Sequence, residues 1–307
     1  IHKTIRKKDK NVVMTTIFKK ASPTHRSRSC EDSTIIAINK KSRELLHYDN
    51  SHSKELQVDP VLFLENPVVE FRYDLIDCRI DICSTEVLVL FSDNFDYQDL
   101  RNHFVHGILG SELGHKVQTH IITGEYAARV RTLNTYVAVS KDIMQRWCYP
   151  MVPDNNITGS TSFQFQRPNI YKERDVILSR SANIGDVSTL GQGTRVGDNS
   201  LVQYSTIGRN CKIGNNVTIS NSFLWNNVVV EDGSTIKNAI VCDGVIIKKD
   251  THISEGCVLS FGVVVGPAIT LPTETKIVRD FVESFFDLKD QEDVKPCFAI
   301  DLGSEGK

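Results

Sequence analysis

An aliphatic residue recurs at every fifth or sixth position from Leu178 to Val265, and this period constrains the fold more than any other feature of the chain. Three consecutive blocks, VQYSTIGRNCKIGNNVT, ISNSFLWNNVVVEDGST and IKNAIVCDGVIIKKDTH, repeat the same spacing. A step of this size suits short parallel strands that turn a corner after each aliphatic anchor. The repeat therefore predicts a parallel β-helix over residues 178–272, with the anchors pointing into its core.

Small residues stand between the anchors. Glycine follows several anchors, as at Gly191 and Gly208, and we expect it to sit at tight corners. Serine, threonine or cysteine stands four residues after others, where a small side chain would fit beneath the next coil. With three strands to a coil and successive coils ~4.8 Å apart, roughly five coils would form a prism about 25 Å long.

Residues 1–150 have a different pattern, in which strand-like and helix-like runs alternate. The strand-like runs are NVVMTTIF (11–18), VVEFRYDLIDCRIDIC (68–83), KVQTHIIT (116–123) and a hairpin around NKKSR. The helix-like runs are NFDYQDLRNHFVHGIL (94–109) and TLNTYVAVSKDIMQRW (132–147). This alternation predicts an α/β domain. Residues 151–177 read as a linker, and residues 273–307 as an acidic, mostly mobile tail.

Charge, cysteine content and hydropathy exclude several classes of function. The 307 residues carry 36 basic and 38 acidic side chains, so bulk charge gives no reason to expect a nucleic-acid partner. The eight cysteines stand singly, without Cys-x-x-Cys pairs or zinc spacing, and indicate reduced thiols in a cytosolic protein without a metal or other cofactor. No apolar run approaches the ~20 residues of a membrane span, so no membrane partner is expected.

The histidines limit the enzymes that such a β-helix could represent. Acyltransferases and carbonic-anhydrase-like proteins with hexapeptide repeats need histidines that project from the coils, as a general base or as metal ligands. His252 is the only histidine of the repeat segment, and it stands beside KKDT in what reads as a solvated edge. The sequence therefore argues against both classes.

An α/β domain followed by a hexapeptide helix is the layout of nucleotide-sugar pyrophosphorylases and their relatives. The motifs VEFRYDLIDCRIDICS, DNFDYQDLRNHFVHGIL, EYAARV, RWCYP, NIYK and VVVGPAITLP resemble, in this order, the epsilon subunits of eukaryotic translation initiation factor 2B. The resemblance covers roughly residues 10–272 and implies that the β-helix is left-handed. It also implies the assembly and substrate-docking part of a guanine-nucleotide exchange factor, whose partners are a homologous gamma subunit and GDP-bound initiation factor 2.

Departures from these families concern catalysis. The chain opens in a polar, helix-like stretch without an initiator methionine, so we expect a fragment without the Gly-rich loop that holds nucleotide phosphates. Where a pyrophosphorylase carries its magnesium-binding aspartate, this chain has Arg129 and Arg131, which cannot hold a metal ion. The residues after Pro272 leave no room for the helical module that carries exchange in the family.

We therefore expect a degenerate nucleotidyltransferase domain that is kept for binding and has no catalytic residue. The alternative is a sugar-nucleotide pyrophosphorylase or its non-catalytic regulatory homologue. An intact Gly-rich loop with its lysine in the full-length sequence would favour that alternative.

Three residues are candidates for partner contact. In the family, the Asn-Phe pair after the RYDLIDC strand contributes to engagement of the substrate factor, and here that pair is Asn94 and Phe95. The same two residues can be read as a helix N-cap followed by a core residue. Trp225 stands directly after an anchor and should point outward, either toward a partner or beneath the linker.

Overall fold

The computed structural model describes residues 1–28, 33–51, 55–110, 114–157 and 159–279. Its internal contacts divide the chain into two compact units, Ile1–Ser140 and Lys141–Lys307. The division falls inside helix α5 (Leu133–Met144) and therefore earlier than the boundary expected at residue 150. In the described parts of the chain, no helix combines the length and the apolar character that crossing a membrane requires.

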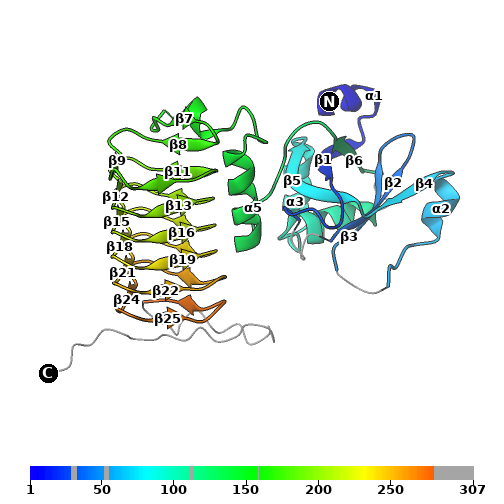
Figure 1. Cartoon of the computed structure of the whole chain (residues 1–307). Helices are drawn as coiled ribbons and strands as arrows, with labels where there is room; N and C mark the ends of the chain where they lie inside the picture. The colour runs from blue at the N-terminus through cyan, green and yellow to red at the C-terminus, as the bar shows by residue number, and fades with distance from the viewer. Residues whose placement is uncertain (29–32, 52–54, 111–113, 158, 280–307) are drawn as a thin grey trace. The chain divides into compact units, whose positions relative to one another are not determined.

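The first unit is an α/β domain with two small sheets, of strand order β5-β1-β6 and β3-β2-β4 (Figure 1). Its strands are β1 (Val12–Lys20), β2 (Ile35–Asn39), β3 (Leu45–Asp49), β4 (Val69–Arg72), β5 (Leu75–Cys83) and β6 (Lys116–Ile122). Its helices are α1 (His2–Lys8), α2 (Val61–Glu65), α3 (Glu86–Asp93), the π-helical turn η2 (Leu100–Val105) and α4 (His106–Leu109). The central strand β1 pairs antiparallel with β5 and parallel with β6, which explains why its run of Val, Met, Thr and Ile is almost continuously buried.

The expected strands and the β2–β3 hairpin are present, but two expected elements differ. The run 68–83 forms two strands, because the chain turns at Asp74, whose carboxylate accepts hydrogen bonds from Arg72 at 2.6 and 2.8 Å. The helix expected from residue 94 begins at Leu100, and α3 lies where the sequence predicted no helix. The β-branched and leucine-rich run EVLVLF has no clear helical period, so its helix was missed.

The second unit is a parallel β-helix with three faces of stacked strands, preceded by the short 3₁₀ turn η3 (Pro153–Asn155) (Figure 1). One face holds β10 (Asn183–Ile184), β13 (Leu201–Gln203), β16 (Thr218–Ser220), β19 (Thr235–Lys237), β22 (His252–Ile253) and β25 (Thr270–Leu271). The second holds β9 (Ile177–Leu178), β12 (Arg195–Val196), β15 (Lys212–Ile213), β18 (Val229–Val230), β21 (Ile246–Ile247) and β24 (Val264–Val265). The third holds β7 (Gln164–Gln166), β8 (Ile170–Lys172), β11 (Ser188–Leu190), β14 (Thr206–Ile207), β17 (Phe223–Leu224), β20 (Ile240–Val241), β23 (Val258–Leu259) and β26 (Lys276–Ile277).

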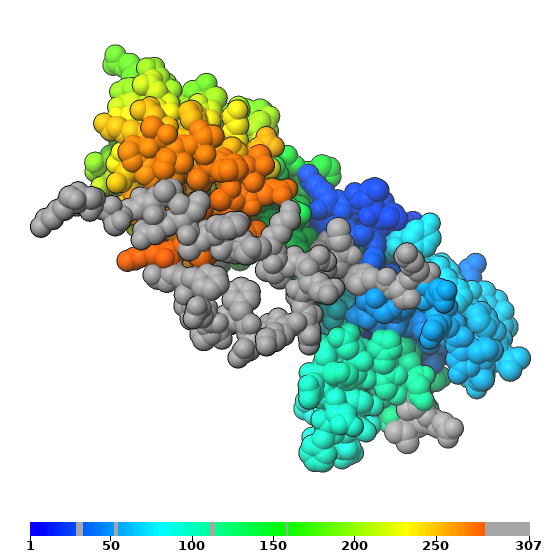
Figure 2. Space-filling model, turned by 90° about the horizontal axis from the view of Figure 1, so that it is seen from below, coloured from blue at the N-terminus to red at the C-terminus, as the bar shows by residue number. Residues whose placement is uncertain are grey.

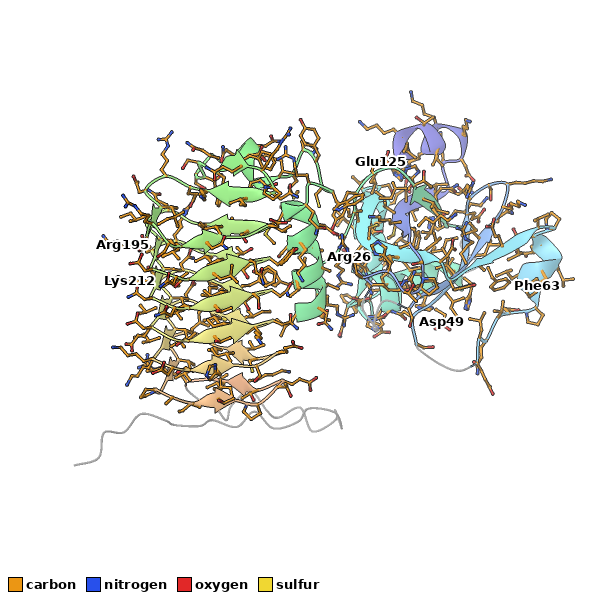
Figure 3. All side chains as sticks on the ribbon, viewed as in Figure 1. Arg26, Asp49, Phe63, Glu125, Arg195 and Lys212 are labelled. Atoms are coloured by element: carbon orange, nitrogen blue, oxygen red, sulfur yellow. The ribbon has the colours of Figure 1, made fainter. Side chains whose placement is uncertain are left out.

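The aliphatic anchors form the core of this unit, as the repeat predicted. Val202, Ile219, Ile236 and Ile253 pair in register on successive coils, and none is more than 2% exposed. Each such burial contributes ~1.5–3 kcal/mol. The residues beside the anchors point the other way: Figure 3 shows Arg195 and Lys212 projecting outward from neighbouring coils. The fold class, an α/β domain followed by a left-handed hexapeptide β-helix, is confirmed.

The expected boundaries of the β-helix need correction at both ends. Strands β7 and β8 lie inside the range 151–177 that was read as a linker, because β8 pairs with β11 and so continues the third face. At the other end β26 pairs with β23, which carries the coils past residue 272. The expected mobile tail lies outside the described residues from residue 280 onward.

Glycine is required after the anchors for a reason other than the tight corner that the sequence led us to expect. A Cβ on Gly208 would lie 2.6 Å from the backbone carbonyl carbon of Trp225 in the next coil, so the glycine permits close stacking of coils. The corners themselves use other residues in the left-handed region, such as Asn227 (φ 58) and Gly244 (φ 71). Asparagine is one of the few side chains that tolerate this region. Figure 2 looks along the β-helix from the end of the last described coils, coloured orange, with the earlier yellow and green coils behind them.

Buried hydroxyls join the coils at the corners. The Ser200 hydroxyl donates to the carbonyl of Gly214 at 2.7 Å and accepts from the backbone N–H of Val217 at 3.0 Å. Since Ser200 is fully buried, these two bonds satisfy a polar group that would otherwise be costly to desolvate. The prediction of small residues beneath the next coil is confirmed for this position.

Candidate functional site

The Asn94–Phe95 pair lies at the C-terminal end of α3. The backbone N–H and the side-chain amide of Asn94 both donate to the carbonyl of Leu90, at 3.2 and 2.9 Å. Its own carbonyl accepts from the N–H of Tyr97 at 3.1 Å. Asn94 therefore closes α3 and does not cap the following helix, so the N-cap interpretation is wrong.

The following helix, η2, has its own N-cap. The Asp99 carboxylate accepts from the backbone N–H groups of Arg101 at 2.8 Å and Asn102 at 2.6 Å. These bonds, the one from Asn102 above all, favour the charged carboxylate and place the pKa of Asp99 below its usual value, although burial opposes the shift. Nδ1 of His103 accepts from the N–H groups of Gln98 and Asp99, at 3.1 and 3.0 Å. Hydrogen bonds thus fix both ends of the segment between the helices.

An aromatic cluster also packs the same segment against the core of the first unit. The rings of Phe91 and Phe104 stack with centroids 5.0 Å apart, and Tyr97 meets both edge-on at 5.8 and 5.9 Å. Phe104 is fully buried, so the cluster is part of the core of the first unit. Such ring pairs add ~0.5–1.5 kcal/mol beyond their buried area. The turn at residues 94–99 is therefore a fixed piece of structure.

Phe95 projects from this fixed turn with 91% of its surface exposed. The interpretation of Phe95 as a core residue is therefore wrong. Leu88 and Val89 on α3 are also 71% and 59% exposed, while Val87 of the same helix is buried. We refer to Leu88, Val89 and Phe95 as the α3 surface. Leu88 and Val89 lie on α3 and Phe95 directly follows its C-cap, and exposed apolar side chains that gather on a surface are typical of sites of protein contact.

A buried ion network supports the neighbouring helix η2. The guanidinium of Arg101, 1% exposed, donates to both oxygens of Asp77 at 2.6 and 3.0 Å and to Asp81 at 2.8 Å. The Tyr48 hydroxyl donates to Asp77 at 3.0 Å. Burial opposes ionisation of Asp77, but Arg101 outweighs it and lowers the pKa of that carboxyl; burial wins at Asp81, whose pKa is raised. Sequence reasoning missed this network, because its members lie on three different elements, β3, β5 and η2.

Trp225 lies in the second unit. It follows the anchor Leu224 and is half-buried on the outside of its coil. Its ring meets that of Phe261 edge-on, with centroids 5.7 Å apart, and Phe261 is 56% exposed. The pair forms an aromatic ridge on the surface of the β-helix. A partner contact at Trp225 stays a prediction.

The region where a pyrophosphorylase would hold magnesium contains no carboxylate cluster. Arg129 and Arg131 lie in the coil between β6 and α5. Nη1 of Arg129 is buried and has no hydrogen-bond partner within the described ranges. No group of His, Cys, Asp and Glu side chains in these ranges could hold a metal ion. His252 is exposed on β22, in keeping with the solvated edge that the sequence indicated.

Comparison with known proteins agrees with the resemblance found in the sequence. Residues 167–271 match the family model described as the EIF2B subunit epsilon LbH domain. The translation initiation factor eIF2B subunit epsilon of Schizosaccharomyces pombe is 48% identical over 200 residues, which cover 64% of this chain and 29% of that protein. That of Dictyostelium discoideum is 49% identical over 193 residues, which cover 62% and 27%. The resemblance to the eIF2B epsilon subunit is confirmed.

The chain thus spans less than a third of the length of these two eIF2B epsilon relatives. The match favours an epsilon-type chain over the alternative of a sugar-nucleotide pyrophosphorylase. Among solved structures, a perosamine N-acetyltransferase from Caulobacter crescentus is 14% identical over 35% of this chain and 51% of its own, with a TM-score of 0.33. That likeness is too low to bear on function.

Proposed function

We propose that this chain is an assembly and substrate-docking part of an eIF2B-type guanine-nucleotide exchange factor, which acts on GDP-bound initiation factor 2 in the cytosol. The observation that carries the proposal is the 91% exposure of Phe95 on a turn fixed by hydrogen bonds and stacked rings. An aromatic ring that stays exposed to water contributes no burial free energy to the fold of its own domain. A partner that covers the ring would gain ~1.5–3 kcal/mol.

Rigidity of the turn favours docking by this surface. Binding costs free energy when flexible groups become ordered, and a turn that is already ordered avoids most of this cost. Leu88 and Val89 extend the apolar area along α3. Aromatic residues in the centre of such patches contribute most to binding in many interfaces. Phe95 is therefore the expected anchor, with Asn94 holding it in position through the bonds to Leu90.

The first unit is proposed to be a degenerate nucleotidyltransferase domain that binds but does not catalyse. Arg129 and Arg131 stand in the segment expected to supply a metal-binding aspartate. Phosphoryl transfer needs a cation to neutralise the charge that develops on the phosphate oxygens, and two arginines cannot hold a metal ion.

The outer surface of the β-helix, with Trp225 and Phe261 at its aromatic ridge, is proposed to contact other subunits, chiefly a homologous gamma subunit.

The rate of GDP release in the assembled exchange factor tests this function. Phe95→Ala in the full-length subunit should slow release of a fluorescent GDP from initiation factor 2 by about 5- to 30-fold, the range for loss of one aromatic anchor. Phe63→Ala is the matched control, because Phe63 is also exposed, at 51%, and lies on α2 (Figure 3). Normal exchange by the Phe95→Ala complex, with its subunits fully assembled, would exclude docking through the α3 surface.

A further inference from the structure

The three faces of the β-helix differ in the side chains that they turn outward. On its strands the anchor points into the core, so the residue before the anchor points away from it. The first face presents mainly polar residues there, such as Asn183, Thr235 and His252. The third face presents Phe223 and Ile240, which are covered, because they are only 1% and 6% exposed. The second face differs from both.

The second face carries one straight line of outward side chains, which we call the second-face column. Its members pair in register from coil to coil and therefore stand ~4.8 Å apart. The apolar residues at its two ends, Ile177 and Val264, are 55% and 44% exposed. A basic part that spans two coils is thus followed by an apolar part that spans three. In order, the column consists of Ile177, Arg195, Lys212, Val229, Ile246 and Val264.

The two basic side chains of the column lie next to each other without a counter-charge. Arg195 and Lys212 are in-register neighbours on β12 and β15, and Figure 3 shows both projecting outward. Like charges in this arrangement repel each other and destabilise a sheet. Within the described residues, neither side chain forms an ion pair or a hydrogen bond. The carboxylate nearest to Arg195 along the chain, that of Asp198, accepts a hydrogen bond from the Ser181 hydroxyl at 2.8 Å.

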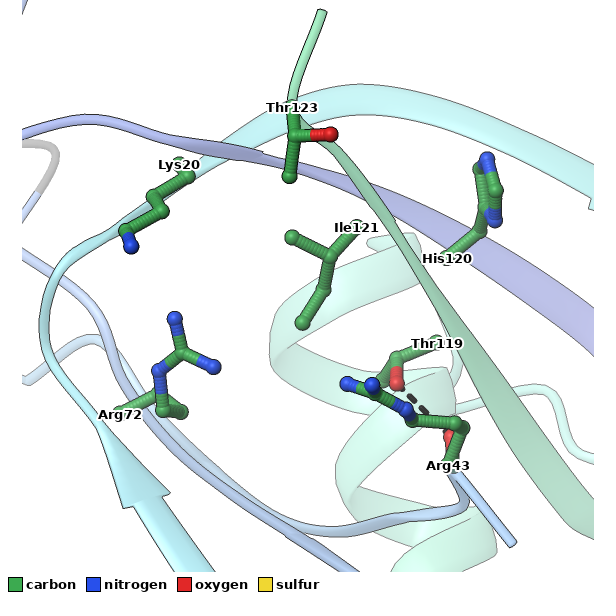
Figure 4. A pocket seen from close by; sticks show the side chains of 7 residues that line it. All are labelled: Lys20, Arg43, Arg72, Thr119, His120, Ile121 and Thr123. Carbon is green, nitrogen blue, oxygen red and sulfur yellow. Dashed lines mark hydrogen bonds between the residues drawn. The ribbon is translucent and has the colours of Figure 1, made fainter. Parts of the chain in front are cut away.

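Two other arginines show the usual arrangement, in which a carboxylate faces the guanidinium. Arg72, beside the pocket of Figure 4, pairs with Asp74 at 2.6 Å and with Glu70 at 3.0 Å. Arg209, on the β-helix itself, pairs with Glu173 at 2.7 Å. An acidic partner would give the stacked cations of the second face the same compensation and would replace their repulsion by attraction.

The third face shows how a helix lies on such a stack of coils. At the end of α5, the Met144 carbonyl accepts from the Tyr171 hydroxyl at 2.9 Å, and Lys141, one turn earlier, donates to the Asn221 side chain at 3.2 Å. Tyr171 and Asn221 belong to different coils, so this part of α5 spans several coils. A helix advances ~5.4 Å per turn and the stack ~4.8 Å per coil. Side chains one turn apart can therefore meet successive coils.

We propose that the second face binds an acidic amphipathic helix of a partner protein. Acidic side chains at one end of this helix pair with Arg195 and Lys212. Apolar side chains on its next three turns cover Val229, Ile246 and Val264, at the spacing by which amphipathic helices dock on apolar surfaces. Acidic residues are favoured near a helix N-terminus, so the N-terminal turns lie on the basic coils.

This inference goes beyond the proposed function. The second-face column shares no residue with the α3 surface or with the aromatic ridge. A failure of the inference would therefore leave the proposed function standing.

Fluorescence anisotropy of a labelled synthetic peptide, measured with the whole chain, tests the proposal. The peptide is an alanine-rich helix of about five turns, with glutamates on the first two turns and leucines on the next three, all on one face. We expect saturable binding with a Kd of about 10–100 µM, as for a weak and transient contact. Arg195→Glu and Lys212→Glu should each weaken binding at least about fivefold, because an attraction becomes a repulsion.

Urea unfolding of the same two variants separates binding from folding. Each substitution removes the like-charge pair, so the unfolding midpoint should not fall. Lys237→Glu is the matched control, because Lys237 is also exposed on the β-helix but lies on β19 of the first face. It should change the affinity for the peptide by less than about twofold, as screening predicts for a distant exposed charge.

Four results would overturn the proposal. The first is a loss in Lys237→Glu equal to that in Lys212→Glu, or no loss in either column variant. The second is equally tight binding of a peptide that has lysines in place of its glutamates. The third is no saturable binding up to about 1 mM. The fourth is self-association of the chain that Lys212→Glu abolishes, which would assign the second face to a second copy.

Discussion

Gly208 should tolerate no side chain, because the next coil of the β-helix lies directly against it. A Cβ at this position would lie 2.6 Å from both the carbonyl carbon and the oxygen of Trp225, and 2.9 Å from the backbone nitrogen of Asn226. All three are backbone atoms, so no side chain can rotate away. To restore ordinary contact the coils would have to separate by roughly 0.8 Å, and overpacking of this kind costs ~1–3 kcal/mol.

Urea unfolding followed by tryptophan fluorescence measures this loss in Gly208→Ala. Both tryptophans of the chain, Trp147 and Trp225, belong to the second unit, so the signal reports on the β-helix and its flanking segment alone. With an m value of ~1–3 kcal/mol per molar urea, the midpoint should fall by about 1 M.

Gly244→Asn is the matched control for this substitution. Gly244 has φ 71 and open space around it, and Asn227 adopts the same conformation (φ 58) at the equivalent corner one coil earlier. Asparagine should therefore change the free energy of unfolding by less than about 0.5 kcal/mol. A midpoint for Gly208→Ala as high as that of Gly244→Asn would refute close coil approach as the reason for this glycine.

Three further substitutions test other parts of the structure. Ile236→Asp should remove more than ~5 kcal/mol from the β-helix by placing a charge in its apolar core, and an unchanged urea midpoint would contradict the register. Arg101→Met should destabilise the first unit by ~3–5 kcal/mol because Asp77 stays buried without its cation; an unaltered thermal transition by circular dichroism would contradict this. Arg209→Gln should cost about 1 kcal/mol at pH 7, since the pair is partly exposed. Burial opposes ionisation of Glu173, but Arg209 outweighs it and lowers the pKa of that carboxyl. The pair therefore stabilises the fold above the unfolded pKa of ~4.5, and this contribution is lost as the pH falls through the folded pKa. A loss of stability in Arg209→Gln that grows toward acid pH would contradict this sign.

The β-helix could be predicted because its determinants repeat locally. The positions of Val202 and Ile219 in their blocks already give the strand, the corner and the buried face. The need for glycine at position 208 could not be predicted in the same way. It depends on how closely a coil seventeen residues further along approaches the backbone, and this distance is a property of the assembled stack.

The site was predicted in part. The sequence singled out Asn94 and Phe95, but whether Phe95 is buried depends on where α3 ends, and α3 itself was missed. The network around Arg101 was beyond sequence reasoning, because a lone arginine is normally a surface residue and its partner Asp77 lies on another element. Long-range packing decides both features.

The affinity of this chain for initiation factor 2 tests most directly whether the α3 surface is a docking site. Binding of the whole chain to fluorescently labelled, GDP-bound factor should be measured for the wild type, Phe95→Ala and Phe63→Ala. Loss of a fully exposed anchor should weaken binding about 5- to 30-fold in Phe95→Ala and leave Phe63→Ala within about twofold of the wild type. Equal affinities for all three proteins, or an equal loss in the two variants, would contradict docking through Phe95.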